Sequence, residues 1–152
     1  MSGETEGSDD GSYQACYGCG QKNAQGLRMT FAQLPDGTAE CVYSAAEHLA
    51  GAPGVIHGGV QAALLDEVMG HAIHVGGVDP DLDVVTVDFS LRYQRPAPIA
   101  VPLTLRARLV RSAGRDFFVT GEILSPKGEV LTTAEARWRR VLRRQNSMPS
   151  TK

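Results

Sequence analysis

The segment IHGGVQAALLDEVMGHAIHV, residues 56–75, decides the fold of this chain. Residues 60–75 contain no proline, and apolar side chains recur at the helical spacing of positions 60, 63, 64, 68, 72 and 75. Further apolar residues at 62, 65, 69 and 73 occupy much of the remaining helix surface. A helix that is apolar on most sides is typical of one that a sheet wraps. We therefore predict one long, buried helix, ended by the turn sequence GGVDPD at 76–81.

The residues before this helix predict two strands and a loop. Residues 27–34 and 38–44 read as strands, and PDG at 35–37 reads as the hairpin turn between them. From Glu47 onward the sequence HLAGAPG, with two glycines and a proline, predicts a loop that leads into the helix.

After the helix, apolar and polar residues alternate, which predicts strands with one buried face. Four such runs cover residues 85–93, 103–109, 117–123 and 130–138. SAG at 112–114 and SPKG at 125–128 predict hairpin turns, so the last three strands should form an antiparallel meander. RPAPIAVP at 95–102 is too rich in proline for a strand interior and predicts an extended bend.

These elements add up to an α+β fold in which an antiparallel sheet of about six strands wraps around one long central helix. One helix cannot cover six strands completely, and the edge strands would stay unpaired. We therefore expect dimerisation to complete the core and to protect an edge.

Length and composition predict one domain with short tails. The chain has 152 residues, of which 42% are hydrophobic and 21% charged, which excludes disorder as its main state. Its net charge of −2 provides no general attraction for nucleic acid. No apolar run approaches the roughly 20 residues of a membrane span. We expect a disordered acidic tail at 1–12, a domain at 13–141 and a basic, polar tail at 142–152; because the first residues are acidic where a secretory signal is basic, we expect a cytoplasmic location.

The three cysteines do not form a disulfide framework. Cys16 and Cys19 form one C-x-x-C pair, and Cys41 lies in a predicted strand. A structural zinc site usually has four ligands, often from two such pairs, and here Cys41 or a histidine would have to complete it. We favour a tight turn that Gly18 and Gly20 permit, with a metal site as the alternative.

The start of the predicted helix is suited to acyl-transfer chemistry. Gly58 and Gly59 follow His57, and the first turn of a helix carries backbone N–H groups without intrahelical partners at a partly positive end. Glycines let a substrate carbonyl approach these N–H groups, which could then hold a developing oxyanion. The alternative is that the glycines merely permit a sharp entry into the helix.

Two adjacent carboxylates, Asp66 and Glu67, lie in the middle of this otherwise apolar helix. A buried carboxylate is costly unless it has a partner or a function, and one at this place could act as a general base or as a nucleophile at a thioester carbonyl. The two side chains are about 100° apart on the helix, so at most one should face a shared cleft. The alternative is that one of them points to solvent at the sheet edge.

The distance between the two features implies a shared site. Asp66 lies eight residues beyond Gly58, which is about 12 Å along a helix. A base or nucleophile must come within about 3–3.5 Å of the carbonyl carbon that the N–H donors hold. If both features are catalytic, Asp66 of one subunit must therefore meet Gly58 of another across a two-fold axis.

Three segments together resemble a known family. HGGVQAALLDEVMG, the strand TVDFSLRYQRPAP and the opening CYGCGQKNAQGL are similar to those of hotdog-fold acyl-CoA thioesterases of the phenylacetate-pathway type, within the broad 4-hydroxybenzoyl-CoA thioesterase superfamily. The resemblance covers roughly residues 13–141. It implies a hotdog fold, thioester hydrolysis and a homodimer or homotetramer. It implies no metal or redox cofactor, and coenzyme A enters only as part of the substrate.

The resemblance also assigns roles at the candidate catalytic positions. It implies that His57 orients the helix entry, that the N–H of Gly58, next to Gly59, polarises the thioester carbonyl, and that Asp66 is the acid contributed across the dimer interface. Thr86 falls where some relatives place a hydroxyl that positions water, although its strand parity puts it opposite the apolar set.

The candidate substrate-binding residues are Glu67, Leu49, Arg92 and Arg95. Leu49 is a departure, because relatives often carry Gln or Asn in this loop, and His48 is the polar alternative. Arginines suit the phosphates of coenzyme A, although most of those in this chain read as solvated strand faces or a basic tail. His71 and His74, one helical turn apart, have a metal-binding spacing but no evident third ligand.

We expect the chain to hydrolyse an acyl-CoA or acyl-carrier thioester. One alternative is a non-catalytic acyl-CoA binder or sensor on the same fold. Another is a hotdog hydratase or dehydratase, against which the HGG sequence with a mid-helix acid argues.

Overall fold

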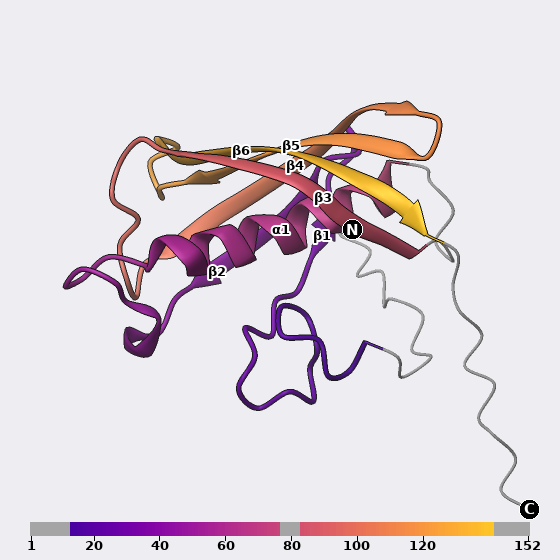
Figure 1. The fold of residues 1–152 in the computed structure, drawn as a ribbon. Helices are drawn as coiled ribbons and strands as arrows, with labels where there is room; N and C mark the ends of the chain where they lie inside the picture. Colours follow the sequence, from indigo (N-terminus) through magenta and orange to yellow (C-terminus); the bar gives the residue numbers. More distant parts are fainter. Residues whose placement is uncertain (1–12, 77–82, 142–152) are drawn as a thin grey trace, which may run out of the picture.

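A computed structural model describes residues 13–76 and 83–141 of the chain. It consists of a curled six-stranded sheet and one long helix that lies across one face of that sheet (Figure 1). The predicted tails at 1–12 and 142–152, and most of the turn at 76–81, lie outside the described residues. In chain order the elements are β1 (Ala32–Gln33), β2 (Ala39–Ser44), the short 3-10 helix η1 (Glu47–Leu49), α1 (Gly58–Val75), β3 (Asp83–Tyr93), β4 (Pro102–Ala113), β5 (Asp116–Leu124) and β6 (Val130–Val141).

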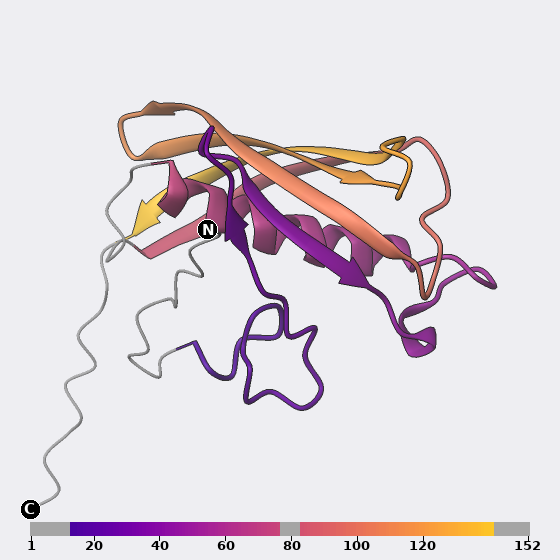
Figure 2. The ribbon, with the colours of Figure 1, turned by 180° about the vertical axis from the view of Figure 1, so that it is seen from behind.

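The strand order is β1-β2-β4-β5-β6-β3, and every neighbouring pair is antiparallel. The predicted meander of the last three strands is confirmed, and its turns carry Gly114 at φ +59° and Gly128 at φ +82°, a conformation that favours glycine. β3 returns to the far side of β6 and forms one edge of the sheet, as both views show (Figures 1 and 2). This arrangement confirms the predicted α+β class and the hotdog fold.

The core lies between α1 and the concave face of the sheet. The helix packs mainly on β4 and β5 and buries one continuous apolar face, made of Leu64, Leu65, Val68, Met69, Ala72 and Ile73. None of the helices in the two described segments combines the length and the apolarity that a membrane span needs.

The predicted strand at 27–34 is wrong for most of its length, since only Ala32–Gln33 pairs with β2. Leu27 and Met29 are buried, which explains the apolar pattern. Their backbone N–H groups donate instead to the N-terminal loop, from Leu27 to the carbonyl of Tyr17 at 2.7 Å and from Met29 to that of Gly18 at 2.9 Å. This stretch therefore anchors the loop of residues 13–26 rather than extending the sheet.

β3 contains a β-bulge that the alternating sequence did not reveal. Thr86 pairs with Trp138, and Asp88 pairs with Arg137, the next residue along β6. Val87 is therefore an extra residue on β3 without a partner on β6. An extra residue reverses which side chains face the core.

The bulge corrects the predicted parity of β3. Thr86 was expected opposite the apolar set, with Val85 and Val87 facing inward. Instead Val85 and Val87 are 46% and 38% exposed, and Thr86 lies on the side of the sheet that faces α1. Beyond the bulge Phe89 packs against the core as predicted.

Candidate active site

The first turn of α1 leaves two backbone donors, the N–H groups of Gly58 and Val60, without an acceptor among the described residues. His57 is the N-cap: its Nδ1 accepts the N–H of Gly59 at 2.9 Å, and its carbonyl accepts the N–H of Gln61 at 3.0 Å. The N–H of Gly58 has no acceptor among the described residues. Of the two glycines proposed from the sequence, Gly58 therefore has a backbone N–H available for a substrate carbonyl, whereas the N–H of Gly59 is bonded to the His57 side chain.

Tyr93 fixes the position of this turn. Its hydroxyl donates to the carbonyl of Gly58 at 2.8 Å, which ties the end of β3 to the start of α1. A Cβ at residue 58 would lie 3.3 Å from that hydroxyl, so a side chain there would press on Tyr93. Tyr93 was not predicted from the sequence, because nothing local links it to a glycine 35 positions away.

Gln61 holds the loop that leads into the helix, a role that was not predicted from the sequence. It is 3% exposed; its Nε2 donates to the carbonyl of Ile56 at 3.0 Å and its Oε1 accepts the hydroxyl of Thr132 at 2.6 Å. A glutamine in the apolar part of the helix was the available signal, since a buried amide needs partners.

Leu49 places no polar side chain at the helix entry. The side chain of Leu49 is buried in the core, and only its carbonyl reaches the site region, where it accepts the N–H of His57 at 2.9 Å. His48 is exposed on η1. The loop thus supports the helix entry through its backbone.

Asp66 and Thr86 form the central pair of the candidate site. The hydroxyl of Thr86 donates to Oδ1 of Asp66 at 2.7 Å. Burial raises the pKa of Asp66 above its usual value, and the Thr86 hydrogen bond opposes that rise. The β3 bulge makes this contact possible, because it turns Thr86 toward the helix.

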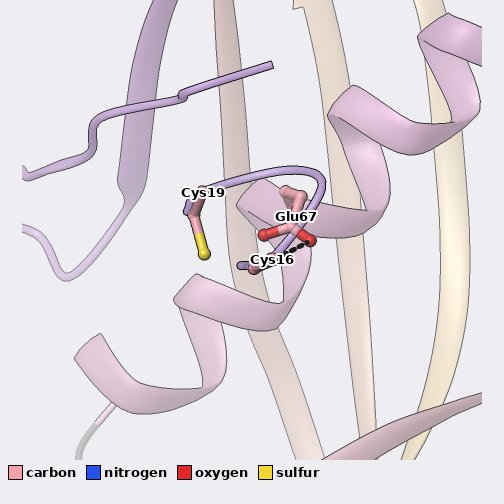
Figure 3. A group of neighbouring side chains, drawn as sticks. All are labelled: Cys16, Cys19 and Glu67. Atoms are coloured by element: carbon pink, nitrogen blue, oxygen red, sulfur yellow. Dashed lines mark hydrogen bonds between the residues drawn. The ribbon is translucent and has the colours of Figure 1, made fainter. Parts of the chain in front are cut away.

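Glu67 points to a different part of the molecule. Its Oε1 accepts a hydrogen bond from Sγ of Cys16 at 3.5 Å, and Cys19 lies beside it (Figure 3). Burial is the main cause of its raised pKa, and the charge of Asp66 adds to it. The two neighbouring carboxylates therefore face different surroundings, as their angular separation on the helix predicts.

The candidate arginines have exposed side chains, and neither makes a hydrogen bond or ion pair at the helix start among the described residues. Arg92 lines an open hollow together with Arg106 and Arg108. Arg95 follows β3, and its backbone N–H donates to the carbonyl of Leu131 at 3.0 Å.

The histidine pair does not join a metal cluster among the described residues. The ring of His71 stacks on Phe31, with a centroid separation of 4.5 Å. Burial, together with the charge of His74, lowers the pKa of His71 to about 4. This histidine is therefore part of the packing between the helix and the segment before β1.

Known proteins are similar to this chain in sequence and in fold. The family model of the thioesterase superfamily matches residues 53–132. Acyl-coenzyme A thioesterase THEM4 of Rattus norvegicus is 29% identical over 93 residues, which is 61% of this chain and 38% of that protein. THEM4 of Mus musculus is 30% identical over 86 residues, 57% of this chain and 35% of that protein. The match thus spans little more than a third of the length of these relatives.

Solved structures of thioesterases have a similar fold. The thioesterase superfamily protein RHA08564 superposes with a TM-score of 0.73 at 34% identity, over 79% of this chain and 57% of that one. A phenylacetic acid degradation-related protein of Ralstonia eutropha gives a TM-score of 0.66 at 27% identity, over 76% of this chain and 86% of that one. With the family match, the helix that begins at Gly58 and the six-stranded sheet around it, the chain belongs to the thioesterase superfamily.

Proposed function

We propose that this protein hydrolyses the thioester bond of an acyl-CoA. The proposal rests mainly on Asp66, a half-buried residue of α1 that accepts a hydrogen bond from Thr86. The first turn of the same helix offers the free N–H of Gly58. The names of the THEM4 relatives, acyl-coenzyme A thioesterases, support coenzyme A as the carrier of the acyl group.

The proposed reaction uses the two groups on opposite sides of the thioester carbonyl. The N–H of Gly58 donates to the carbonyl oxygen and stabilises the negative charge that develops there. Asp66 takes a proton from a water molecule as that water attacks the carbonyl carbon; alternatively, its carboxylate attacks directly and water releases the acyl group from it. In both routes the carbon–sulfur bond breaks, and the coenzyme A thiolate leaves and takes up a proton. Thr86 keeps one carboxylate oxygen occupied, which orients the other toward the reacting atoms.

The site we propose is shared between two subunits. Asp66 lies eight residues, or about 12 Å of helix, from Gly58, too far for both groups of one chain to meet one carbonyl. β3 is an edge strand, and pairing of β3 with β3 of a second copy would give partners to its outward-facing backbone N–H and C=O groups. We propose a homodimer with two antiparallel helices and two such sites.

A thiol-release assay tests this proposal. Purified protein is incubated with short, long, branched and aromatic acyl-CoAs, and free coenzyme A is measured with a thiol reagent. We expect release from at least one class, and loss of that release in Asp66→Ala. Release that persists in Asp66→Ala would contradict the proposal.

A non-catalytic acyl-CoA binder is the second candidate, and the loop before His57 favours it. That loop presents the backbone of Leu49 rather than a polar side chain for holding water or substrate. Saturable binding of acyl-CoA without any thiol release, measured by calorimetry, would favour the binder.

A further inference from the structure

Cys16, Cys19 and Glu67 form a compact group outside the site described above. The sulfur atoms of both cysteines and a carboxylate oxygen of Glu67 all lie within 4.8 Å of one another, and all three residues are half-buried. The cysteines belong to the loop of residues 13–26, and Glu67 comes from the middle of α1, 51 residues after Cys16 (Figure 3). We propose that this group is a zinc-binding site that fastens the N-terminal loop to the helix.

The spacing of the three atoms matches a tetrahedral zinc centre. Zinc binds sulfur at about 2.3 Å and carboxylate oxygen at about 2.0–2.2 Å, so a tetrahedral angle separates the two ligand atoms by about 3.5–3.7 Å. The distance from Sγ of Cys16 to Oε1 of Glu67 is 3.5 Å. Two thiolates on one zinc ion lie about 3.8 Å apart, which is within the observed span of the group.

The backbone is shaped to let the loop approach Glu67. A Cβ at Gly18, between the two cysteines, would lie 2.0 Å from Cγ of Glu67, so only glycine fits there. The loop is closed by hydrogen bonds from the N–H of Gly20 to the carbonyl of Cys16 and from the N–H of Met29 to the carbonyl of Gly18, both at 2.9 Å. The predicted tight turn is therefore confirmed, and it presents both sulfur atoms on one side.

The chemistry of the group also favours a cation. Two thiols and a carboxylate lie together, partly removed from water, in the half-buried group. A divalent ion replaces the thiol protons and reverses the local charge balance. Thiolates with one carboxylate suit zinc, because magnesium and calcium prefer oxygen ligands alone.

The third ligand, Glu67, lies far from the two cysteines in the sequence, so the sequence alone favoured a simple turn. The C-x-x-C pair was expected to need Cys41 or a histidine, but Cys41 is a buried residue of β2 and is not part of the group. Within the described residues no fourth such side chain joins it, so water would complete the tetrahedron. The ion would fasten the N-terminal loop to Glu67, the residue that follows Asp66 on α1. It would not contact the substrate.

Metal analysis and cobalt spectroscopy of the full-length protein test this proposal. We expect about one zinc per chain after purification, removal by a chelator, and rebinding of Co²⁺ with thiolate-to-cobalt charge-transfer bands and the intense visible bands of tetrahedral cobalt. Glu67→Gln and the pair Cys16→Ser with Cys19→Ser should weaken zinc binding at least about 100-fold. Asp66→Asn and Cys41→Ala serve as matched controls and should keep the ion.

Two results would overturn the proposal. One is wild-type protein that neither contains nor rebinds stoichiometric zinc or cobalt. The other is a purified protein whose mass under non-reducing conditions is lower by the two hydrogens of a Cys16–Cys19 disulfide. If the double cysteine variant does not fold, Glu67→Gln alone decides, since it removes one oxygen ligand and keeps the side-chain shape. Thiol release is measured separately, so failure of the zinc site leaves the proposed hydrolysis intact, and the reverse also holds.

Discussion

At the scale of single residues, the chemistry depends on how one helix separates two adjacent carboxylates. Asp66 meets Thr86 on β3, and Glu67 meets Cys16 in the N-terminal loop. Both carboxyl groups are partly removed from water, and burial raises both pKa values. Their neighbours therefore decide their roles: a hydroxyl donor beside a sheet edge suits proton transfer, and two thiols suit a metal ion.

Replacing Asp66 by asparagine keeps the shape of the side chain and removes the base or nucleophile. We expect kcat for thiol release to fall by at least about 100-fold, with the thermal unfolding temperature nearly unchanged. Steady-state kinetics on the best acyl-CoA measures this. Glu47→Gln, at an exposed carboxylate of η1, is the control and should retain full activity.

Thr86 is expected to act through Asp66. Thr86→Val removes the hydroxyl that donates at 2.7 Å and should lower kcat by about 10-fold with little change in KM. Thr86→Ser keeps the donor and should retain most of the activity. Equal losses in both variants would mean that Thr86 matters only for packing.

His71 should make stability depend on pH. Its pKa falls from 6.5 to about 4 in the folded chain, where it faces the Phe31 ring and His74. Between these values the unfolded chain binds a proton that the folded chain does not, so stability is full above pH 6.5 and is lost as the pH falls toward 4. The loss is on the order of 2 kcal/mol, because the side chain is partly exposed.

Urea unfolding of wild type and His71→Phe at several pH values checks this. The variant keeps the ring stack and cannot be protonated, so its stability should fall less than that of wild type between pH 7 and pH 4.5. Parallel curves for the two proteins would contradict the assignment, and His71→Leu tests whether the larger ring itself causes strain.

The residues of the site differed in how far the sequence could predict them. The helical pattern was enough to place Gly58 at the helix start and Asp66 in its middle, and the family resemblance implied the role of His57, which is the N-cap of this helix. Tyr93 and the pairing of Glu67 with Cys16 depend on contacts across 35 and 51 positions, which only the folded chain specifies. Thr86 was placed on the wrong face, because a bulge without glycine leaves no mark in the alternating pattern.

At the scale of elements, the close packing of α1 on the sheet requires small residues at defined points. A Cβ at Gly70 would lie 2.8 Å from Cη2 of Trp138 on β6, and a Cβ at Gly121 on β5 would lie 2.9 Å from Cγ of Met69. Glycine in the middle of a helix ordinarily lowers stability. Here it lets the helix approach the sheet.

Gly70→Ala is therefore expected to destabilise the protein, although alanine favours helices by about 1 kcal/mol. Overpacking against Trp138 costs about 1–3 kcal/mol, which leaves a net loss of about 1 kcal/mol in the free energy of unfolding. Denaturant unfolding measures it. In a Trp138→Phe background, which removes the atoms that the new methyl group meets, the same change should be neutral or stabilising.

Local signals specified the elements well where turns and periodicity agreed. The helix, the hairpins at Gly114 and Gly128 and the meander of β4, β5 and β6 follow from them. The strand expected at 27–34 failed because its buried residues bond to the N-terminal loop instead of to a neighbouring strand. Burial alone does not distinguish these two states in a sequence.

At the scale of the whole molecule, β3 has one unpaired edge within the described residues, and Asp66 lies about 12 Å of helix from Gly58. In our proposal a two-fold dimer would explain both features, since pairing at that edge would also bring each Asp66 to the helix start of the other copy. Sharing of the site between subunits is the central claim of our proposal for function.

Mixing two inactive variants tests that claim. Asp66→Asn removes the acid. Gly58→Pro removes the N–H donor at the first helical position, where proline is tolerated and where His57 before it already has an extended ψ of 136°. Because its Cβ would lie 3.3 Å from the Tyr93 hydroxyl, circular dichroism and the unfolding temperature first establish that this variant folds. After subunit exchange, confirmed by mass spectrometry, half of the dimers carry one variant of each kind, and each of these contains one intact site. Our account predicts thiol release at about a quarter of the wild-type rate from the mixture; no activity above that of the separate variants would contradict it.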